Sequence, residues 1–190
     1  MPLGRLLPGE ILLFCNKRSW FGDFIGRTKA WFIAYAQRNE GFKLEDARWH
    51  HAGIYMGDGI AAEAVPKLGL ARTPLKPAYN EHEILPRSKL GMTALEGGRV
   101  AAAADERVRA KLQYNYGLIA QIVAAKYAKR LGIFGRLLPP LARLLAQEGE
   151  ICTTLCRHSY AAALGIDIFH SKRDLRAIMP ANISETDLLE

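Results

Sequence analysis

Residues 51–65 read HAGIYMGDGIAAEAV, and this stretch decides the fold. Two apolar runs flank a Gly-Asp-Gly turn, and an Asp-Gly pair between strand-like runs is typical of an antiparallel β-hairpin. Alternate residues of a strand share a face, so His51 and Gly53 point the same way. The returning run brings Glu63 alongside the His51 end of the first run. The sequence therefore predicts a hairpin that carries a histidine and a glutamate side by side.

Glu63 is a charged side chain inside an otherwise apolar run. Burying an unpaired charge is costly, so such a residue needs a partner. We expect its carboxylate to accept the proton on the far imidazole nitrogen of His51 and so to hold the tautomer of that ring. Two alternatives stay open here: Glu63 on an edge strand in water, and His51 as a satisfied structural residue.

Cys152 lies in the segment GEICTTL, residues 149–155, just before an expected helix from about Thr153 to Leu164. The first N–H groups of a helix are unpaired and its dipole favours negative charge there. Because the thiolate is the reactive form of cysteine, this position suits a nucleophile. The alternative is a small buried cysteine that packs the helix. Cys156 and Cys15 are expected in the core, with a resolving thiol as the other interpretation of Cys156.

Together these residues have the form of a nucleophile at a helix start, a base on a strand and an orienting carboxylate on the adjoining strand. By strand parity only one of His50 and His51 can face the cysteine, and the glycine beside it favours His51. His158 is expected on another face of the cysteine helix, and His82 and His170 in loops. No His, Cys or carboxylate set has metal-ligand spacing, so we predict no metal and no cofactor.

The rest of the chain predicts both strands and helices, as in an α+β fold. Further predicted elements are a strand within Leu6–Phe14, a helix over Trp20–Gln37, a loop over Asn39–Arg48, a loop over Pro66–Pro77, a strand at Glu83–Leu85 that ends at Pro86, and a helix over Ala94–Tyr116 with a weak point at Gly97-Gly98. Gly165 is expected to cap the cysteine helix. At 190 residues the whole chain, 1–190, is expected to form a single domain.

Cysteine content, apolar stretches and net charge bear on the compartment and partners of the protein. Three cysteines fit a reducing compartment rather than a disulfide framework. The opening MPLGRLLPGEILLF lacks the apolar stretch of a secretory signal, and no window reaches the ~18 apolar residues of a membrane span. We expect a cytoplasmic protein; release by lysis or a specialised secretion system stays open. The net charge of +7 fits either a solvated basic surface or an anionic partner such as a membrane or cell-wall polymer, and no nucleic-acid module is present.

Four segments resemble one known family. They are LPGEILLF at 7–14, HAGIYMGDG at 51–59, EA at 63–64 and ICTTL at 151–155, and a fifth, MPANI at 179–183, is similar to a closing motif of that family. The family is the circularly permuted branch of the NlpC-type papain-like cysteine peptidases, which includes YiiX-like proteins and the lecithin retinol acyltransferase group. The order histidine, third polar residue, cysteine marks the permuted form.

The resemblance implies an α+β papain-like core in which a small antiparallel sheet packs against the nucleophile-bearing helix, with extra helices. It implies hydrolysis or transfer at amides, esters or thioesters, with Cys152 as nucleophile, His51 as base and Glu63 as orienting group. The backbone N–H of Cys152 would help to bind the oxyanion. Tyr116 resembles a tyrosine upstream of the family's cysteine, with a tentative oxyanion or substrate role. Residues of about 118–147 look like a helical insertion to which nothing carries over.

The substrate stays open between a peptide amide and a lipid ester or thioester. An aromatic-rich stretch, Trp20–Tyr35, and a Lys/Arg- and Leu-rich stretch, Lys126–Ala146, favour a lipid surface, unless both simply pack on the core. We expect a hydrolase that works through an acyl-enzyme. The alternatives are an acyltransferase on lipid or amine acceptors, and a non-catalytic binding module of the same fold.

Overall fold

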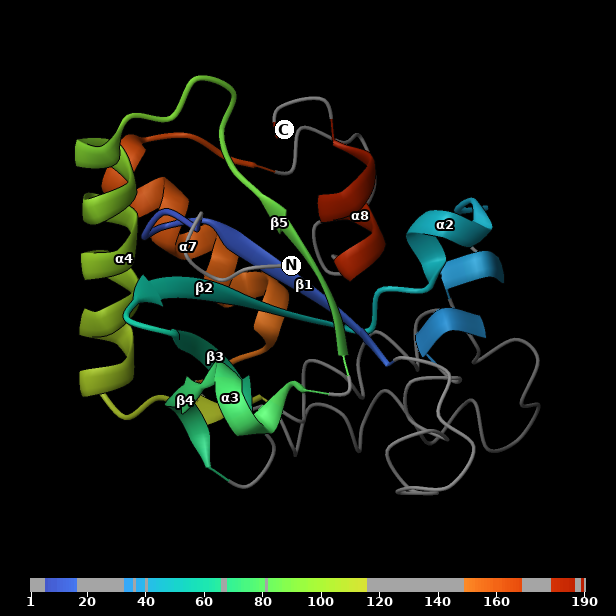
Figure 1. Cartoon of the computed structure of the whole chain (residues 1–190), viewed down its shortest axis with the longest axis horizontal. Helices are drawn as coiled ribbons and strands as arrows, with labels where there is room; N and C mark the ends of the chain where they lie inside the picture. Colours follow the sequence, from blue (N-terminus) through green and yellow to red (C-terminus); the bar gives the residue numbers. More distant parts are fainter. Residues whose placement is uncertain are drawn as a thin grey trace, which may run out of the picture.

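The computed structural model describes residues 6–16, 33–35, 37–39, 41–65, 68–80, 82–115, 149–168, 179–186 and 189. This part of the chain is α+β and is built on a five-stranded antiparallel sheet in the order β4-β3-β2-β1-β5 (Figure 1). The strands are β1 (Ile11–Asn16), β2 (His51–Gly57), β3 (Ile60–Val65), β4 (Gly69–Pro74) and β5 (His82–Arg87). A separate parallel pair joins β6 (Gln113–Tyr114) to β7 (Gly149–Glu150). The helices are α2 (Leu44–Ala47), α3 (Leu75–Ala78), α4 (Ala94–Arg109), α7 (Cys152–Leu164) and α8 (Pro180–Glu185).

The expected hairpin is present as β2 and β3. Asp58 and Gly59 both adopt positive φ, 50° and 72°. Positive φ at both central residues defines the two-residue turn that matches the twist of paired strands, and Asp-Gly favours it. The resulting register places Gly53 opposite Glu63.

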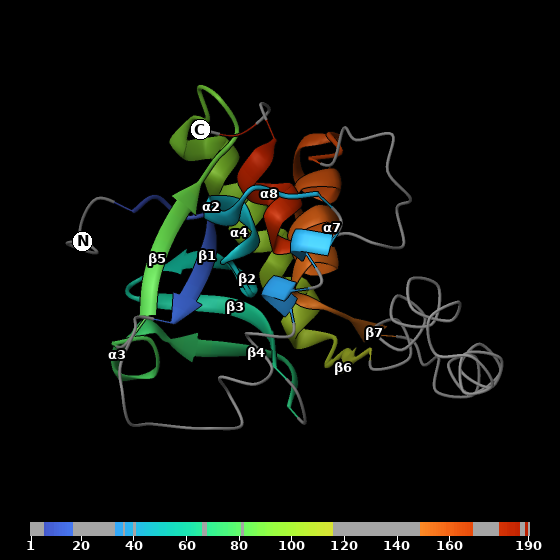
Figure 2. The same cartoon turned by 90° about the vertical axis from the view of Figure 1, so that its right-hand side faces the viewer.

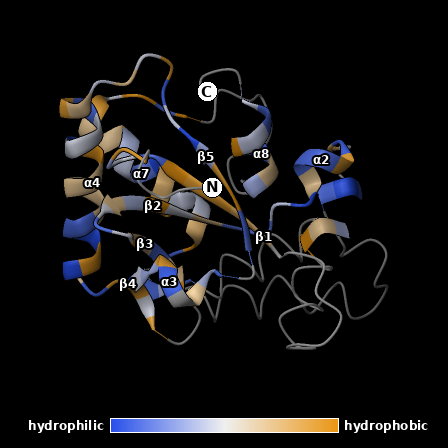
Figure 3. Ribbon diagram, in the orientation of Figure 1, coloured by the Kyte–Doolittle hydropathy of each residue, from blue (hydrophilic) through white to orange (hydrophobic). Residues whose placement is uncertain are grey.

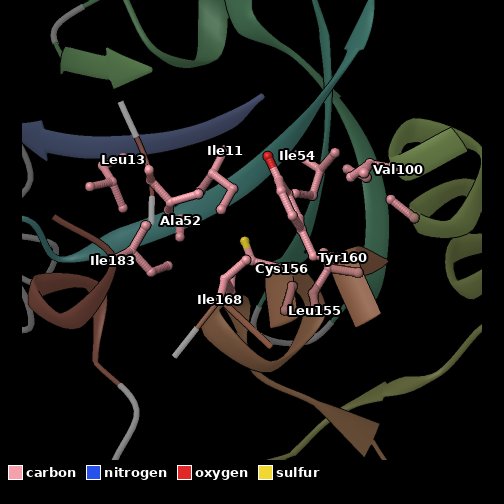
Figure 4. Close-up of a cluster of buried hydrophobic side chains, with 14 of the residues drawn as sticks. Ile11, Leu13, Ala52, Ile54, Val100, Leu155, Cys156, Tyr160, Ile168 and Ile183 are labelled. Carbon is pink, nitrogen blue, oxygen red and sulfur yellow. The ribbon is translucent and has the colours of Figure 1, made fainter. Parts of the chain in front are cut away.

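The sheet is covered differently on its two faces. On one face the helices α4 and α7 pack against it, whereas α3 lies on the other (Figure 2). Side chains of β1 and β2 alternate between the faces: Ile11, Leu13, Ala52 and Ile54 meet Leu155, Cys156 and Tyr160 of α7 (Figure 4). Leu12, Phe14, Tyr55, Ala61 and Leu75 form the second cluster. Because β1 is buried on both faces, it is hydrophobic along most of its length (Figure 3).

Gly97 in α4 is a contact point between backbones and not the weak point that the sequence suggested. A Cβ at Gly97 would lie 2.2 Å from the Pro8 carbonyl oxygen, and one at Gly9 would lie 2.3 Å from the Gly97 oxygen. The helix is secured just before this contact, where Thr93 and Glu96 form a capping box. The glycine therefore lets the turn before β1 lie directly on α4.

Several predicted loops and bounds are wrong. The stretch Pro66–Pro77 contains β4 and the start of α3, and α2 lies inside the expected loop Asn39–Arg48. The prolines misled the prediction, because proline is tolerated on edge strands, and β4 and β5 are the two edges of this sheet. The helix α4 ends at Arg109, well before Tyr116, and His82 begins β5 instead of lying in a loop.

The cysteine helix agrees with its prediction. The helix α7 begins at Cys152, and Gly165 caps its end in the left-handed conformation, with φ of 68°. Most of the Trp20–Gln37 helix, His170, Tyr116 and the insertion 118–147 lie outside the described residues. Within the described part of the chain, no helix has the length and hydropathy needed to cross a bilayer.

Candidate active site

His51 and Glu63 are in contact, as the hairpin predicts. The imidazole Nε2 lies 2.7 Å from the carboxylate Oε2, and the Glu63 side chain is only 1% exposed. Gly53, opposite Glu63, lies close to the neighbouring strand, because a Cβ there would lie 3.0 Å from the Ala62 carbonyl oxygen and 3.4 Å from the Glu63 Cβ. Glu63 is thus a buried carboxylate paired with a histidine, not a solvated edge residue.

Cys152 completes the group of three residues that the sequence singles out. It is the first residue of α7, is partly exposed, and its side chain hydrogen-bonds with His51. Since Glu63 occupies Nε2, the nitrogen left for Cys152 is Nδ1. The imidazole therefore lies between a sulfur and a carboxylate, and residues from β2, β3 and α7 meet at one place.

The pKa values of the pair reflect this arrangement. Burial alone would lower the pKa of His51, but hydrogen bonds and charge interactions with Cys152 and Glu63 outweigh it and raise the pKa to about 10. Burial would raise the pKa of Glu63, but bonding and charge interaction with His51, together with hydrogen bonds from Thr73 and Tyr79, hold it below its ordinary value. The site thus stabilises an imidazolium beside a carboxylate.

Sequence reasoning missed Thr73 and Tyr79. The Tyr79 hydroxyl donates to Oε2 of Glu63, and its ring stacks on Phe14 with centroids 4.1 Å apart. The Phe14 ring in turn lies 5.6 Å from that of His51. Thr73 lies on β4, opposite Ala61, and so shares a face with Glu63 through the alternation of the sheet. Recognition of β4 would have indicated Thr73, whereas no local signal marks Tyr79.

The other histidines have different surroundings. The His50 ring lies 6.0 Å from the His82 ring, and burial together with the nearby His51 and His82 lowers the pKa of His50 to about 4. His158 has its Nδ1 3.1 Å from Glu150. The structure thus brings His51 to Cys152, whereas His50 lies near His82.

The other cysteines belong to the core. Cys156 is fully buried beside Tyr160, and burial raises its pKa (Figure 4). Cys15 packs against the same cluster from β1.

The start of α7 offers backbone donors beside the sulfur. Ile151 precedes the helix, and its N–H donates to the Thr154 hydroxyl at 2.9 Å. The N–H of Cys152 belongs to the first turn, where the helix itself supplies no acceptor. Tyr116, the tentative oxyanion or substrate residue, lies outside the described residues.

No family model, curated protein or solved structure matches the chain. Among the described residues, no group of three or more His, Cys, Asp and Glu side chains could hold a metal ion. The site thus offers the thiol of Cys152 next to the imidazole of His51, which in turn contacts the carboxylate of Glu63. The thiol lies at the start of α7.

Proposed function

We propose that this chain is a cysteine-dependent hydrolase that works through an acyl-enzyme, with Cys152 as nucleophile, His51 as base and Glu63 as orienting group. The observation that carries the proposal is the continuous bonding from Cys152 to His51 and from His51 to Glu63. Nucleophile, base and orienter within bonding reach are what covalent catalysis requires. The pair is partly open, because the cysteine and the imidazole are not fully buried.

In the first half of the reaction the Cys152 sulfur, whose proton is already held on the imidazole of His51, bonds to the substrate carbonyl carbon. The carbonyl π electrons move to oxygen, and the N–H at the start of α7 suits the oxyanion that forms. The oxyanion then collapses and expels the amine, alcohol or thiol, which takes the proton from His51. The product of this half is a thioester on Cys152.

In the second half, water gives a proton to His51 and adds to the thioester carbon. Collapse releases the carboxylic acid and frees the sulfur beside the protonated imidazole, which is the starting state. An amine or alcohol acceptor in place of water would make the same site an acyltransferase. Glu63 accepts the Nε2–H bond throughout, which keeps Nδ1 directed at the sulfur.

The fold supports a more specific proposal, a permuted papain-like core of the NlpC type. The chain order His51, Glu63, Cys152 and the packing of α7 on the antiparallel sheet both fit that arrangement. Under this proposal the substrate is a peptide amide or a lipid ester or thioester. The net charge of +7 favours a substrate held at an anionic membrane or cell-wall polymer. A cytoplasmic location stays a prediction.

The test is a panel of acyl substrates, namely peptide p-nitroanilides, fatty acyl p-nitrophenyl esters and acyl thioesters, assayed with the wild type and Cys152→Ala. We expect hydrolysis of at least one class and loss of all of it in the variant. Cys15→Ala is the matched control, because it removes another thiol, that of β1, and should keep the activity. Equal turnover by Cys152→Ala would refute the proposal.

A further inference from the structure

Two donors converge on one oxygen of the buried carboxylate. Oε2 of Glu63 contacts His51 Nε2 at 2.7 Å and also accepts the hydroxyl of Tyr79. Tyr79 directly follows α3, and lies 16 residues after Glu63 in the chain. Its ring is held by stacking on Phe14 with an interplanar angle of 23°. The hydroxyl therefore approaches Glu63 from a fixed direction.

We propose that Tyr79 is a positioning residue of the reaction, which holds the Glu63 carboxylate in the orientation that presents Oε2 to the His51 ring. This inference rests on the proposed function of Cys152. A carboxylate can rotate about its last bond, and a second donor on the same oxygen removes that freedom. Fixing the carboxylate fixes the imidazole, and with it the direction of Nδ1 toward the sulfur.

The surroundings of Tyr79 keep it a hydrogen-bond donor. Burial, the charge and hydrogen bond of Glu63, and the charge of Cys152 all raise the pKa of Tyr79 well above its ordinary value. His82 of β5 meets the ring edge-on, with centroids 4.9 Å apart. The phenol therefore keeps its proton near neutral pH, and that proton is available to the carboxylate.

A purely structural tyrosine predicts something different. If Tyr79 only filled space against Phe14, a phenylalanine would serve as well, and the reactivity of Cys152 would keep its dependence on pH. If the hydroxyl positions Glu63, its removal takes away one of the bonds that hold the pKa of that carboxyl down. Protonation of Glu63 would then begin at higher pH. The pH at which Cys152 loses its reactivity on acidification would rise with it.

The test is Tyr79→Phe, which keeps the ring and removes only the hydroxyl. The first readout is alkylation of Cys152 by iodoacetamide across pH, measured by peptide mass spectrometry and expressed per folded molecule from the circular dichroism amplitude. We expect an alkylation rate about tenfold lower near neutral pH and an acid limb shifted to higher pH. The matched control is Tyr160→Phe, which removes a buried hydroxyl that donates to the Gly9 carbonyl oxygen at 3.0 Å. Its pH profile should equal that of the wild type.

The second readout separates this inference from the proposed function. Hydrolysis of p-nitrophenyl acetate is measured for Tyr79→Phe and Cys152→Ala together. A Tyr79→Phe profile that superposes on the wild type, with Cys152→Ala inactive, would overturn the positioning role and leave the hydrolase proposal standing. Wild-type turnover by Cys152→Ala would instead remove the hydrolase proposal, and the role of Tyr79 with it.

Discussion

Gly53 lies directly opposite Glu63 in the β2–β3 ladder, and a side chain at Gly53 would crowd the Ala62 carbonyl oxygen of the paired strand. The pairing of β2 with β3 brings the Glu63 carboxylate to the His51 ring. It therefore links the local sequence of a hairpin to a site to which β4, α7 and Tyr79, the residue after α3, also contribute.

Gly53→Ala tests that relationship. The added Cβ would lie 3.0 Å from a backbone oxygen that cannot easily move, so we expect a loss of about 1 kcal/mol in the free energy of unfolding and a several-fold loss of activity. Urea denaturation and substrate turnover measure the two. In Gly98→Ala, the added Cβ meets nothing within 4 Å, and we expect a gain of about 0.5–1 kcal/mol. Equal behaviour of the two variants would contradict the account.

Glu63→Gln tests the orienting carboxylate. The amide has nearly the same shape but no charge, so the imidazolium loses a buried counter-charge and the ring its fixed tautomer. We expect kcat to fall on the order of a hundredfold while the fold, judged by circular dichroism, is kept. Glu106→Gln, which changes an exposed glutamate of α4, is the control and should leave kcat unchanged. A Glu63→Gln enzyme with wild-type kcat would show that the carboxylate plays no part.

The stability of the folded chain should depend on His51 in a pH-dependent way. Its pKa rises from an ordinary 6.5 to about 10 on folding, so the folded state binds a proton more tightly than the unfolded state. The resulting stabilisation is complete below pH 6.5 and is lost as the pH rises toward 10. We expect the difference in urea midpoint between wild type and His51→Ala to shrink over that range. In the Cys152→Ala background the same comparison should give a smaller change, because one of the groups that raise the pKa is gone. A difference in urea midpoint that grows with pH would contradict the raised pKa of His51 in the folded state.

Gln37 should matter for stability although it lies outside the site. Its buried amide donates to the carbonyl oxygens of Ala47 and Trp49, each at 2.8 Å, and accepts the N–H of Ala181. It thereby joins the segment before β2 to α8. Gln37→Ala leaves three buried backbone groups without this partner, and we expect a loss of about 3 kcal/mol in urea denaturation. The neighbouring exposed Arg38→Ala should change stability by less than about 0.5 kcal/mol.

The parts of the fold that the sequence predicts are those with local signals. The Asp58-Gly59 turn and the alternation around it predict the hairpin, and hence the contact between His51 and Glu63. Glycines on both sides of α7 mark its ends, so Cys152 is correctly placed at a helix start. Each of these depends on residues that are neighbours in the chain.

The missed features depend on contacts between separate helices, strands and turns. Pro74 ends an edge strand, where no ladder bond is lost, and so β4 reads as loop from sequence alone. Without β4 the alternation that places Thr73 beside Glu63 is hidden. Tyr79 reaches the same carboxylate only because α3 folds onto the sheet. Gly97 likewise looks like a helix breaker until Pro8 is found against it.

The central claim, that Cys152 forms an acyl-enzyme, is tested most directly by intact-protein mass spectrometry after brief mixing with p-nitrophenyl butyrate. The account predicts a butyryl adduct on the wild type that hydroxylamine removes, as expected of a thioester, and that maps to the peptide containing Cys152. Glu63→Gln, if it slows water activation by His51, should accumulate this adduct for longer. No adduct on the wild type, or an equal adduct on Cys152→Ala, would contradict the claim.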